Sequence, residues 1–266
     1  MKRSPRAEAV SFKVVIPARY ASVRLPGKPL LEIAGKPLIQ HVHERAMESG
    51  AEEVVIATDD QRIADSCLAF GADVCLTGEQ HRSGSDRIAE VVSIRGWGEE
   101  EIIVNLQGDE PCIPPSLLQQ VAQDMESHPA ASITTLCAPI SDRSTLFDPH
   151  VVKVVVDAEG FALYFSRAPI PWHRDEFIDA DRPLPRDTGF HRHIGLYAYR
   201  AGYLRQYVSW EHSPIELAES LEQLRVLWHG GKIHVSAVSE EPGHGVDTQE
   251  DLIRVTRLLE NPPQSI

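Results

Sequence analysis

Three cations lie close together near the start of the chain, in a setting that suits phosphate chemistry. Arg19, Arg24 and Lys28 fall within residues 17–29, a segment that also holds prolines and a glycine. The segment follows a largely apolar run at 12–16, which predicts a strand buried on both faces. It should therefore lie at the carboxyl end of that strand, where open α/β sheets bind ligands. Cations neutralise polyphosphate charge, and a glycine lets backbone N–H groups approach phosphate oxygens.

A basic surface loop is the alternative for this segment. A single cation would most simply be solvated surface charge, but three cations directly after a buried strand favour a phosphate-binding loop. Neither the P-loop pattern GxxxxGK(S/T) nor the dinucleotide pattern GxGxxG follows the first predicted strand. The loop is therefore expected to bind phosphate in some other way.

An acidic pair follows a second buried run. Asp109 and Glu110 come after Gln107 and Gly108, at the end of the apolar run at 102–106. Carboxylates in this position suit a magnesium ion that also contacts phosphate oxygens. The alternative is an acidic turn before a helix, because Asp-Glu-Pro favours turns. The carboxyl ends of parallel strands share one sheet edge, so the nearby basic loop favours the magnesium site.

A third acidic segment lies near the C-terminus, at residues 243–252. Asp247 or Thr248 can cap the last predicted helix, with Glu250 near its positive end. Asp247 can instead be the second carboxylate ligand of a metal held by Asp109. Composition by itself favours the helix cap.

The elements that must position these residues alternate between strand and helix in the first half of the chain. Short apolar runs predict strands at 12–16, 54–57, 74–76 and 102–106. Amphipathic stretches with proline or glycine at their ends predict helices at 36–49, 61–70, 86–94 and 115–125. This alternation predicts an α/β fold with a doubly wound, mostly parallel sheet.

The pattern becomes richer in strands after about residue 132. Strands are expected at 133–137, 151–156, 161–165, 194–199 and 233–238, and helices at 203–209, 215–228 and 249–259. We interpret residues 1–266 as a single domain that carries a strand-rich insertion at about 133–195.

Composition and charge narrow the function. The 26 basic and 39 acidic residues give a net charge of −13, which disfavours nucleic acid and anionic membranes as partners. No run of about 18 apolar residues predicts a membrane span, and residues 1–11 lack the apolar stretch of a secretory signal. The cysteines form no CxxC pair and lie in or beside apolar stretches, as in a cytoplasmic protein with reduced thiols; they are Cys67, Cys75, Cys112 and Cys137.

Taken together, the motifs resemble those of one enzyme family. They occupy residues 16–22, 24–30, 81–87, 105–111, 162–167, 192–197, 221–225 and 245–248. In this order they are similar to the signatures of the 3-deoxy-manno-octulosonate (Kdo) cytidylyltransferases, also called CMP-Kdo synthetases. Two departures are mild: Ser85-Asp86 stands where Thr-Glu is common, and His173 stands where Asp or Asn is usual.

The resemblance implies an activity, a fold and a set of partners. The family transfers CMP from CTP to the anomeric hydroxyl of Kdo and releases pyrophosphate, a cytoplasmic step of lipopolysaccharide synthesis. Its fold is Rossmann-like, of the nucleotide-diphospho-sugar transferase type. The resemblance also implies Mg²⁺ as the cofactor and a homodimer that forms through the insertion.

The resemblance also assigns roles to residues of this sequence. The implied catalytic residues are Lys28, Gln107, Asp109 and Asp247. Asp109 and Asp247 are the implied metal ligands, which reverses the preference for a helix cap at Asp247. The implied CTP-binding residues are Pro17, Ala18, Arg19, Arg24, Lys28, Ser83, Arg87 and Gln107. The implied Kdo-binding residues are Arg167, His193, Tyr197, Glu222 and Gln223.

Two other functions compete with this interpretation. One is a cytidylyltransferase for another acidic sugar, such as an amino-Kdo or a sialic acid. The other is a non-catalytic sensor of nucleotide sugars with the same fold. A sensor needs no pair of metal-binding carboxylates, so Asp109 and Asp247 count against it.

Overall fold

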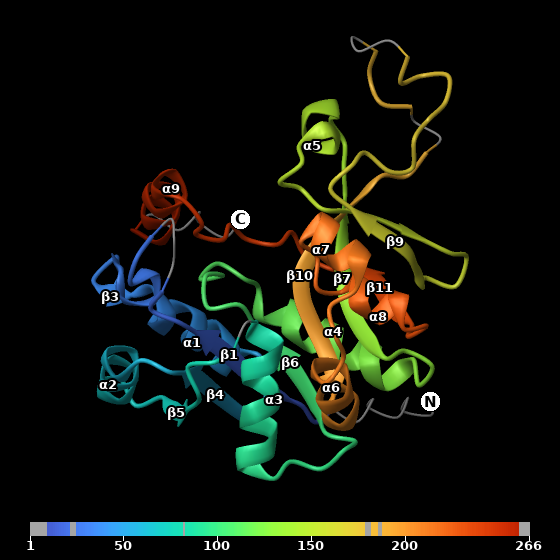
Figure 1. Cartoon of the computed structure of the whole chain (residues 1–266). Coiled ribbons are helices and arrows are strands. Elements are labelled where there is room, and N and C mark those ends of the chain that lie inside the picture. Colours follow the sequence, from blue (N-terminus) through green and yellow to red (C-terminus); the bar gives the residue numbers. More distant parts are fainter. Residues whose placement is uncertain (1–9, 22–24, 82, 179–181, 186–187, 261–266) are drawn as a thin grey trace, which may run out of the picture.

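A nine-stranded mixed sheet runs through the centre of the molecule (Figure 1). The computed structural model describes residues 10–21, 25–81, 83–178, 182–185 and 188–260. The main strand order is β11-β7-β10-β6-β1-β4-β5, and β8 and β9 attach through β10. The bounds are β1 (Lys13–Ala18), β4 (Glu53–Thr58), β5 (Asp73–Leu76), β6 (Ile102–Asn105), β7 (Ile133–Pro139), β8 (Lys153–Val156), β9 (Ala162–Ser166), β10 (His191–Arg200) and β11 (Ile233–Ala237).

The predicted mostly parallel sheet is confirmed. β1 pairs in parallel with β4 and β6, β4 with β5, and β7 with β11. Only β10 runs against its neighbours in the main order, because it is antiparallel to both β6 and β7. The carboxyl ends of β1 and β6 therefore lie at the same edge, as the sequence analysis required.

Helices cover both faces of the sheet, as a doubly wound fold requires. Alternate residues of β1 pack on opposite sides: Val14 and Ile16 join the core under α1, α2 and α4, whereas Val15 joins the core under α3, α6 and α8. The helices are α1 (Leu38–Glu48), α2 (Gln61–Ala69), α3 (Gly84–Arg95), α4 (Pro115–Ser127), α5 (Arg143–Phe147), α6 (Ala201–Val208), α7 (Pro214–Glu219), α8 (Leu224–Trp228) and α9 (Gln249–Glu260). No helix among the described residues is both long and apolar enough to span a bilayer.

Two of the predicted helices differ from the structure. The helix expected at 215–228 is wrong as a single element, because Ser220 adopts a left-handed conformation with φ of 52° and ends α7 before α8 begins. The helix expected from residue 36 begins at Leu38, since Lys36 and Pro37 form β3. β3 pairs with β2 (Glu32–Ile33) in a short hairpin.

The strand-rich segment is continuous with the central sheet. Its outer strands, β7 and β10, are neighbours within that sheet, and β8 pairs with both β10 and β9. Residues between β7 and β10 project beyond the sheet (Figure 1). The projecting part has a small core of its own, formed by Ile140, Leu146, Phe177 and Phe190.

The C-terminal segment crosses the molecule after β11 and ends in α9, which lies beside the β2–β3 hairpin (Figure 1). Buried side chains fix this contact: Ile33 and Leu38 pack with Val246 and Val255. The buried side chain of Val246 therefore anchors the chain directly before Asp247.

Candidate active site

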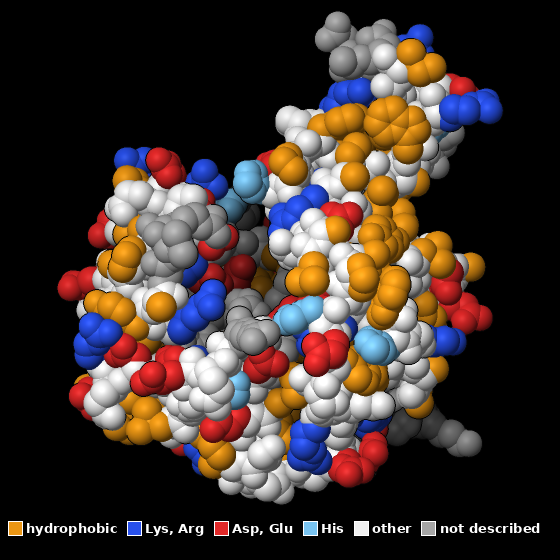
Figure 2. Space-filling model, viewed as in Figure 1, with side chains coloured by type: hydrophobic (Ala, Val, Ile, Leu, Met, Phe, Trp, Pro, Cys, Tyr) orange, Lys and Arg blue, Asp and Glu red, His pale blue; other side chains and the backbone are white. Residues whose placement is uncertain are grey.

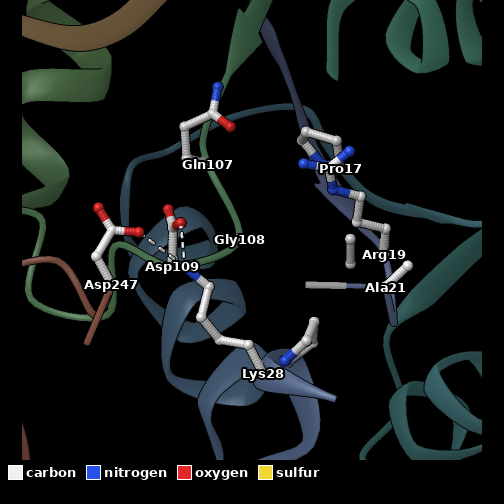
Figure 3. A pocket seen from close by; sticks show the side chains of 10 residues that line it. Pro17, Arg19, Ala21, Lys28, Gln107, Gly108, Asp109 and Asp247 are labelled. Atoms are coloured by element: carbon white, nitrogen blue, oxygen red, sulfur yellow. Dashed lines mark hydrogen bonds and ion pairs between the residues drawn. The ribbon is translucent and has the colours of Figure 1, made fainter. Parts of the chain in front are cut away.

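A cavity of about 840 Å³ opens at the carboxyl ends of β1 and β6 (Figure 3). Its volume lies within the range of about 300–1,000 Å³ that is usual for small-molecule sites. The lining residues are Pro17, Ala18, Arg19, Ala21, Lys28, Pro29, Gln107, Gly108, Asp109 and Asp247. The cavity thus brings together the basic loop and both acidic segments. Arg24, the remaining predicted cation, lies outside the described residues.

The Lys28 ammonium group joins the two predicted metal ligands (Figure 3). Lys28 is the first residue of the short 3-10 helix η1 (Lys28–Leu30). Its Nζ lies 2.6 Å from Oδ2 of Asp109 and 3.2 Å from Oδ1 of Asp247. It also donates a hydrogen bond of 2.7 Å to the backbone carbonyl of Val246. Two carboxylates from distant parts of the chain therefore converge on one positive charge.

Glycines allow the loops around these carboxylates to approach one another. A Cβ atom on Gly108 would lie 2.9 Å from the backbone oxygen of Pro17, so a side chain there would force the β1 and β6 loops apart. A Cβ on Gly245 would lie 2.8 Å from Oε1 of Glu110. The C-terminal segment is held against the β6 loop by a 2.8 Å hydrogen bond from the Val246 amide to the Asp109 carbonyl.

The helix cap at the start of α9 is Thr248. Its Oγ1 accepts from the Asp251 amide at 3.2 Å, and Asp251 Oδ2 accepts from the Thr248 amide at 3.0 Å. Of the two residues that composition offered as the cap, Thr248 is therefore confirmed and Asp247 is not. Asp247 instead directs its carboxylate toward Lys28.

Glu110 adds a third carboxyl group beside the pair. Burial, followed by the charges of Asp109 and Asp247, raises its pKa to about 8. The group is therefore largely protonated at neutral pH. Sequence reasoning noted Glu110 as part of an acidic pair but did not place it among the site residues.

A second, smaller cavity of about 130 Å³ adjoins the first. Both cavities share Pro17, Ala18, Arg19 and Gln107 as lining residues. The remaining wall is the N-terminal turn of α3 with His81, Ser83, Gly84 and Arg87. The positive end of a helix dipole favours an anionic group at this wall.

The two predicted residues on α3 are fixed by contacts within the protein. Ser83 caps α3 reciprocally with Asp86, at 3.1 Å in each direction. The buried guanidinium of Arg87 donates to Asp59 Oδ2 at 2.9 Å and to the Thr77 hydroxyl. These contacts hold both side chains in place in the cavity wall.

A bulge in β10 positions two of the predicted acceptor-binding residues. The ladder with β7 shifts register between Ile194 and Tyr197. In a regular strand, the Cα atoms of residues four apart lie about 13 Å from each other, so their side chains stand well separated. Here the ring centroids of His193 and Tyr197 lie only 5.3 Å apart. The Thr135 hydroxyl holds the bulge through contacts with the Ile194 carbonyl at 3.0 Å, the Leu196 carbonyl at 2.8 Å and His193 Nε2 at 2.9 Å.

Burial keeps both of these side chains uncharged. It lowers the pKa of His193 to about 3 and raises the pKa of Tyr197 well above its ordinary value. Two neutral rings that can exchange hydrogen bonds suit a polyhydroxylated ligand better than a charged pair would.

Glu222 connects the acceptor group to the nucleotide side. Its Oε2 accepts a 3.0 Å hydrogen bond from Ser85 in the first turn of α3. The neighbouring Gln223 is buried, and its Nε2 has no hydrogen-bond partner in the described structure. An unpartnered buried amide is costly unless a ligand completes it, so Gln223 is a strong candidate for a ligand contact.

Arg167 follows β9 and is held by α7. Its Nε donates to the Glu219 carbonyl at 2.7 Å and its Nη1 to the Pro149 carbonyl at 3.0 Å. The Glu219 carboxylate in turn accepts from the Arg167 amide at 2.9 Å and the Ser166 hydroxyl at 2.7 Å. The described linings of the two cavities do not include Arg167.

Sequence reasoning missed several supporting residues. Asn105 accepts a 3.2 Å hydrogen bond from Gln107, and its position as a buried amide at the end of an apolar strand was a usable signal. Thr135 and Glu219 gave no such signal, because a threonine in a strand and a glutamate in a helix are ordinary. Their roles follow from contacts between distant segments.

Comparisons with known proteins identify related enzymes. A family model described as "Cytidylyltransferase" matches residues 13–233. A 3-deoxy-manno-octulosonate cytidylyltransferase of Pseudomonas fluorescens is 58% identical, over 94% of this chain and 98% of the relative. The enzyme of the same name from Nitrosococcus oceani is 55% identical, over 94% of this chain and 97% of the relative.

One solved structure is similar to this chain in sequence and fold, and another is similar in fold only. A CMP:2-keto-3-deoxy-manno-octonic acid synthetase complexed with CTP is 43% identical, with a TM-score of 0.86, over 95% of this chain and all of the other. A 4-diphosphocytidyl-2C-methyl-D-erythritol synthase shares the fold, with a TM-score of 0.61 at 15% identity and the same coverage.

The fold and the matched model define this chain as a nucleotidyltransferase of the cytidylyltransferase class. The high identity over nearly the whole chain narrows the assignment. The chain belongs to the 3-deoxy-manno-octulosonate cytidylyltransferase family.

The lowered pKa of His193 makes stability depend on pH in a defined direction. The unfolded chain takes up a proton near pH 6.5 that the folded chain rejects down to about pH 3, so stability falls as pH falls below 6.5. Between about pH 7 and about pH 5.5, the free energy of unfolding of the unmodified protein should therefore fall because of His193. In His193→Gln this fall should be smaller by about 1 kcal/mol, as measured by urea denaturation at the two pH values.

The exposed His150 provides the matched control for this measurement. His150→Gln should keep the pH dependence of the unmodified protein. If His193→Gln keeps it as well, burial of a neutral imidazole at His193 is not its source.

Proposed function

We propose that this chain transfers CMP from CTP to the anomeric hydroxyl of Kdo, giving CMP-Kdo and pyrophosphate. The names of the relatives and the CTP complex of the 43%-identical structure support both substrates. The single observation that carries the proposal is the convergence of Asp109 and Asp247 on Lys28 in a cavity beside the basic loop. A role in lipopolysaccharide synthesis follows from the product.

The chemistry is a direct nucleotidyl transfer. The hydroxyl oxygen of the sugar forms a bond to the α-phosphorus, the bond from that phosphorus to the bridging oxygen breaks, and pyrophosphate leaves while the hydroxyl proton is released. Such a reaction needs positioning and charge neutralisation more than a covalent nucleophile. A cavity lined by Arg19, Lys28 and Gln107 suits these needs.

The nucleotide side is proposed to bind CTP through the basic loop and the α3 wall. Arg19 and Lys28, with Arg24, would neutralise the triphosphate, while Pro17 and Ala18 line both cavities at the end of β1. The first turn of α3, with Ser83 and the nearby Arg87, would favour an anionic or polar part of the nucleotide.

Magnesium is part of the proposal. The donor set fits, because two carboxylates that already converge on one cation offer the hard oxygen ligands that Mg²⁺ prefers. Asp109 and Asp247 would hold the ion. When bound, it would withdraw charge from phosphate oxygens and make the α-phosphorus more electrophilic.

The acceptor side is proposed to bind Kdo between β10 and the turn before α8. His193 and Tyr197 would exchange hydrogen bonds with sugar hydroxyls as neutral groups. Glu222 and the unpartnered Gln223 amide would complete this surface. Arg167 would pair with the sugar carboxylate through a two-pronged contact that suits guanidinium.

We also propose a homodimer that works in the cytoplasm. β9 pairs only with β8 among the described strands, and we propose that this hairpin takes part in the association. Hydrophobic side chains gather over the projecting segment and the region below it (Figure 2), and Leu163, Trp172 and Ile178 are largely exposed. The four free cysteines, three of them buried, support a reducing compartment.

The deciding experiment measures pyrophosphate release from CTP with magnesium. Release that requires Kdo supports the proposal. Release only with another acidic sugar, such as N-acetylneuraminate, would assign a different acceptor, and CTP binding without release under any of these conditions would favour the sensor.

We expect Asp109→Asn to reduce kcat by about a hundredfold or more while the fold stays intact. Loss of one metal-binding carboxylate removes several kcal/mol of transition-state stabilisation. The assay is pyrophosphate release, with circular dichroism to monitor folding. Asp65→Asn, which removes a carboxylate on α2 outside the cavity, is the matched control. Near-normal turnover of Asp109→Asn would contradict the assignment.

We expect Arg167→Lys to raise the KM for Kdo by about tenfold or more and to leave the KM for CTP nearly unchanged. Lysine keeps the charge but cannot form two parallel hydrogen bonds to a carboxylate. Arg174→Lys, at an exposed position of the projecting segment, is the control. Equal changes in both KM values would mean that Arg167 supports the fold or the dimer, and an unchanged KM for Kdo would remove it from the acceptor site.

We expect a dimer mass at micromolar concentration and a shift to monomer in Leu163→Glu, measured by light scattering. A charge at this exposed apolar position would be buried without a partner in the dimer. Leu68→Glu on α2, which is similarly exposed at 58%, should remain dimeric. A monomer mass for the unmodified chain would refute the dimer.

A further inference from the structure

Two histidines and an aspartate meet away from the active-site cavities, at the β11 edge of the sheet. Asp124 lies in the last turns of α4, His128 caps the end of that helix, and His234 lies on β11. Among the residues that the structure describes, this is a group of three potential metal ligands whose ligand atoms all lie within 4.8 Å of one another.

The two imidazole rings lie beside the same carboxylate. His234 Nδ1 lies 2.7 Å from Asp124 Oδ2. His128 Nδ1 lies 3.0 Å from Asp124 Oδ1 and also 3.0 Å from the Asp124 backbone carbonyl oxygen. The rings are stacked, with centroids 3.6 Å apart and an angle of 16° between their planes. The two Nδ1 atoms therefore lie beside the same carboxylate, but the rings direct them along nearly parallel lines.

The surroundings enclose this region on one side and open it on the other. Asp124 and His234 are 8% and 7% exposed, whereas the His128 side chain is 35% exposed. The turn between β8 and β9 covers His234: Phe161 contacts the ring edge-on, and a Cβ on Gly160 would lie 2.7 Å from His234 Nε2. A small ion can reach the cluster from the His128 side.

The donor set has the chemistry of a transition-metal site. Two imidazole nitrogens and one carboxylate oxygen match the ligands of zinc and its neighbours, and differ from the all-oxygen ligands that magnesium prefers. Donor atoms around a tetrahedral zinc ion, at bond lengths of about 2.0–2.1 Å, lie about 3.3 Å apart. The two imidazole-to-carboxylate separations, 2.7 and 3.0 Å, are close to that value. For both Nδ1 atoms to point at one ion, the His128 ring, whose side chain is 35% exposed, must turn out of the stack and leave the Asp124 backbone carbonyl.

We propose that Asp124, His128 and His234 bind one divalent transition-metal ion, with Zn²⁺ as the best match. Both imidazoles bind as neutral rings through Nδ1, and the protons that Nδ1 directs at Asp124 move to Nε2 or are released. The three ligands leave a further coordination position on the His128 side. The site is separate from Asp109 and Asp247 in both position and ligand chemistry.

Metal binding here would add a further link between three elements that hydrogen bonds already join. The ion would tie the end of α4 to β11, the edge strand of the sheet. The β8–β9 turn packs on the same histidine, and Val235 donates a 2.9 Å hydrogen bond to the Gly160 carbonyl. The ion would therefore stabilise the turn of the β8–β9 hairpin.

The test titrates Zn²⁺ into the full-length chain by calorimetry, after removal of bound metal and in excess Mg²⁺. Excess Mg²⁺ competes for oxygen-ligand sites, and the difference between the unmodified chain and His128→Ala assigns the zinc signal to the histidine cluster. We expect one Zn²⁺ per chain. His128→Ala should weaken binding by about 10- to 100-fold or more, because even loss of an outer hydrogen-bond partner of a metal ligand costs this much.

His150→Ala is the matched control, since it removes an exposed histidine outside the cluster. It should leave zinc affinity unchanged, and His128→Ala should leave the magnesium-dependent release of pyrophosphate unchanged. Equal zinc affinity in His128→Ala and the unmodified chain would overturn the proposal, as would the absence of zinc binding. These outcomes are independent of whether Kdo is the acceptor.

Two further measurements keep the proposal testable if a variant folds poorly. Zn²⁺ should raise the thermal unfolding midpoint of the unmodified chain, because the ion binds the folded state selectively. Co²⁺ in place of Zn²⁺ should give the visible absorption of a site with nitrogen ligands, and Asp124→Asn should alter it. An unshifted midpoint together with a colourless Co²⁺ titration would show an ordinary hydrogen-bonded triad.

Discussion

The position of the Lys28 ammonium group between two carboxylates is the interaction on which the active site depends. Asp109 follows β6 and Asp247 precedes α9, so the three residues come from the beginning, the middle and the end of the chain. Two carboxylates this close repel each other unless a cation lies between them. Lys28 supplies that cation, and its bond to the Val246 carbonyl holds the C-terminal segment over the β6 loop. The same pair of carboxylates is the proposed magnesium site.

The antiparallel strand β10 links the nucleotide side of the molecule to the acceptor side. It pairs with β6, which carries Gln107 and Asp109 beyond its end, and with β7 and β8 on its other side. The bulge in β10 brings His193 and Tyr197 together, while Ser85 on α3 binds Glu222 from the opposite direction. The proposed acceptor residues are thus placed by elements that also border the cavity.

Charge differs between the regions of the molecule. The chain has a net charge of −13, yet the basic loop and the positive end of α3 lie beside the two cavities. These local positive charges oppose an overall field that would repel an anionic substrate. The proposed acceptor residues His193 and Tyr197 are partly exposed and neutral.

The sequence by itself determined the alternating strands and helices, the mostly parallel sheet and the meeting of the basic loop with Asp109, because hydrophobic period and strand ends are local properties. Composition could not decide whether Asp247 or Thr248 caps the last helix. Only the close packing of the C-terminal segment on the β6 loop directs the Asp247 carboxylate toward Lys28. The break between α7 and α8 at Ser220 and the bulge in β10 could not be predicted from the sequence either. A left-handed residue and a register shift depend on contacts between distant segments, and those contacts exist only in the tertiary structure.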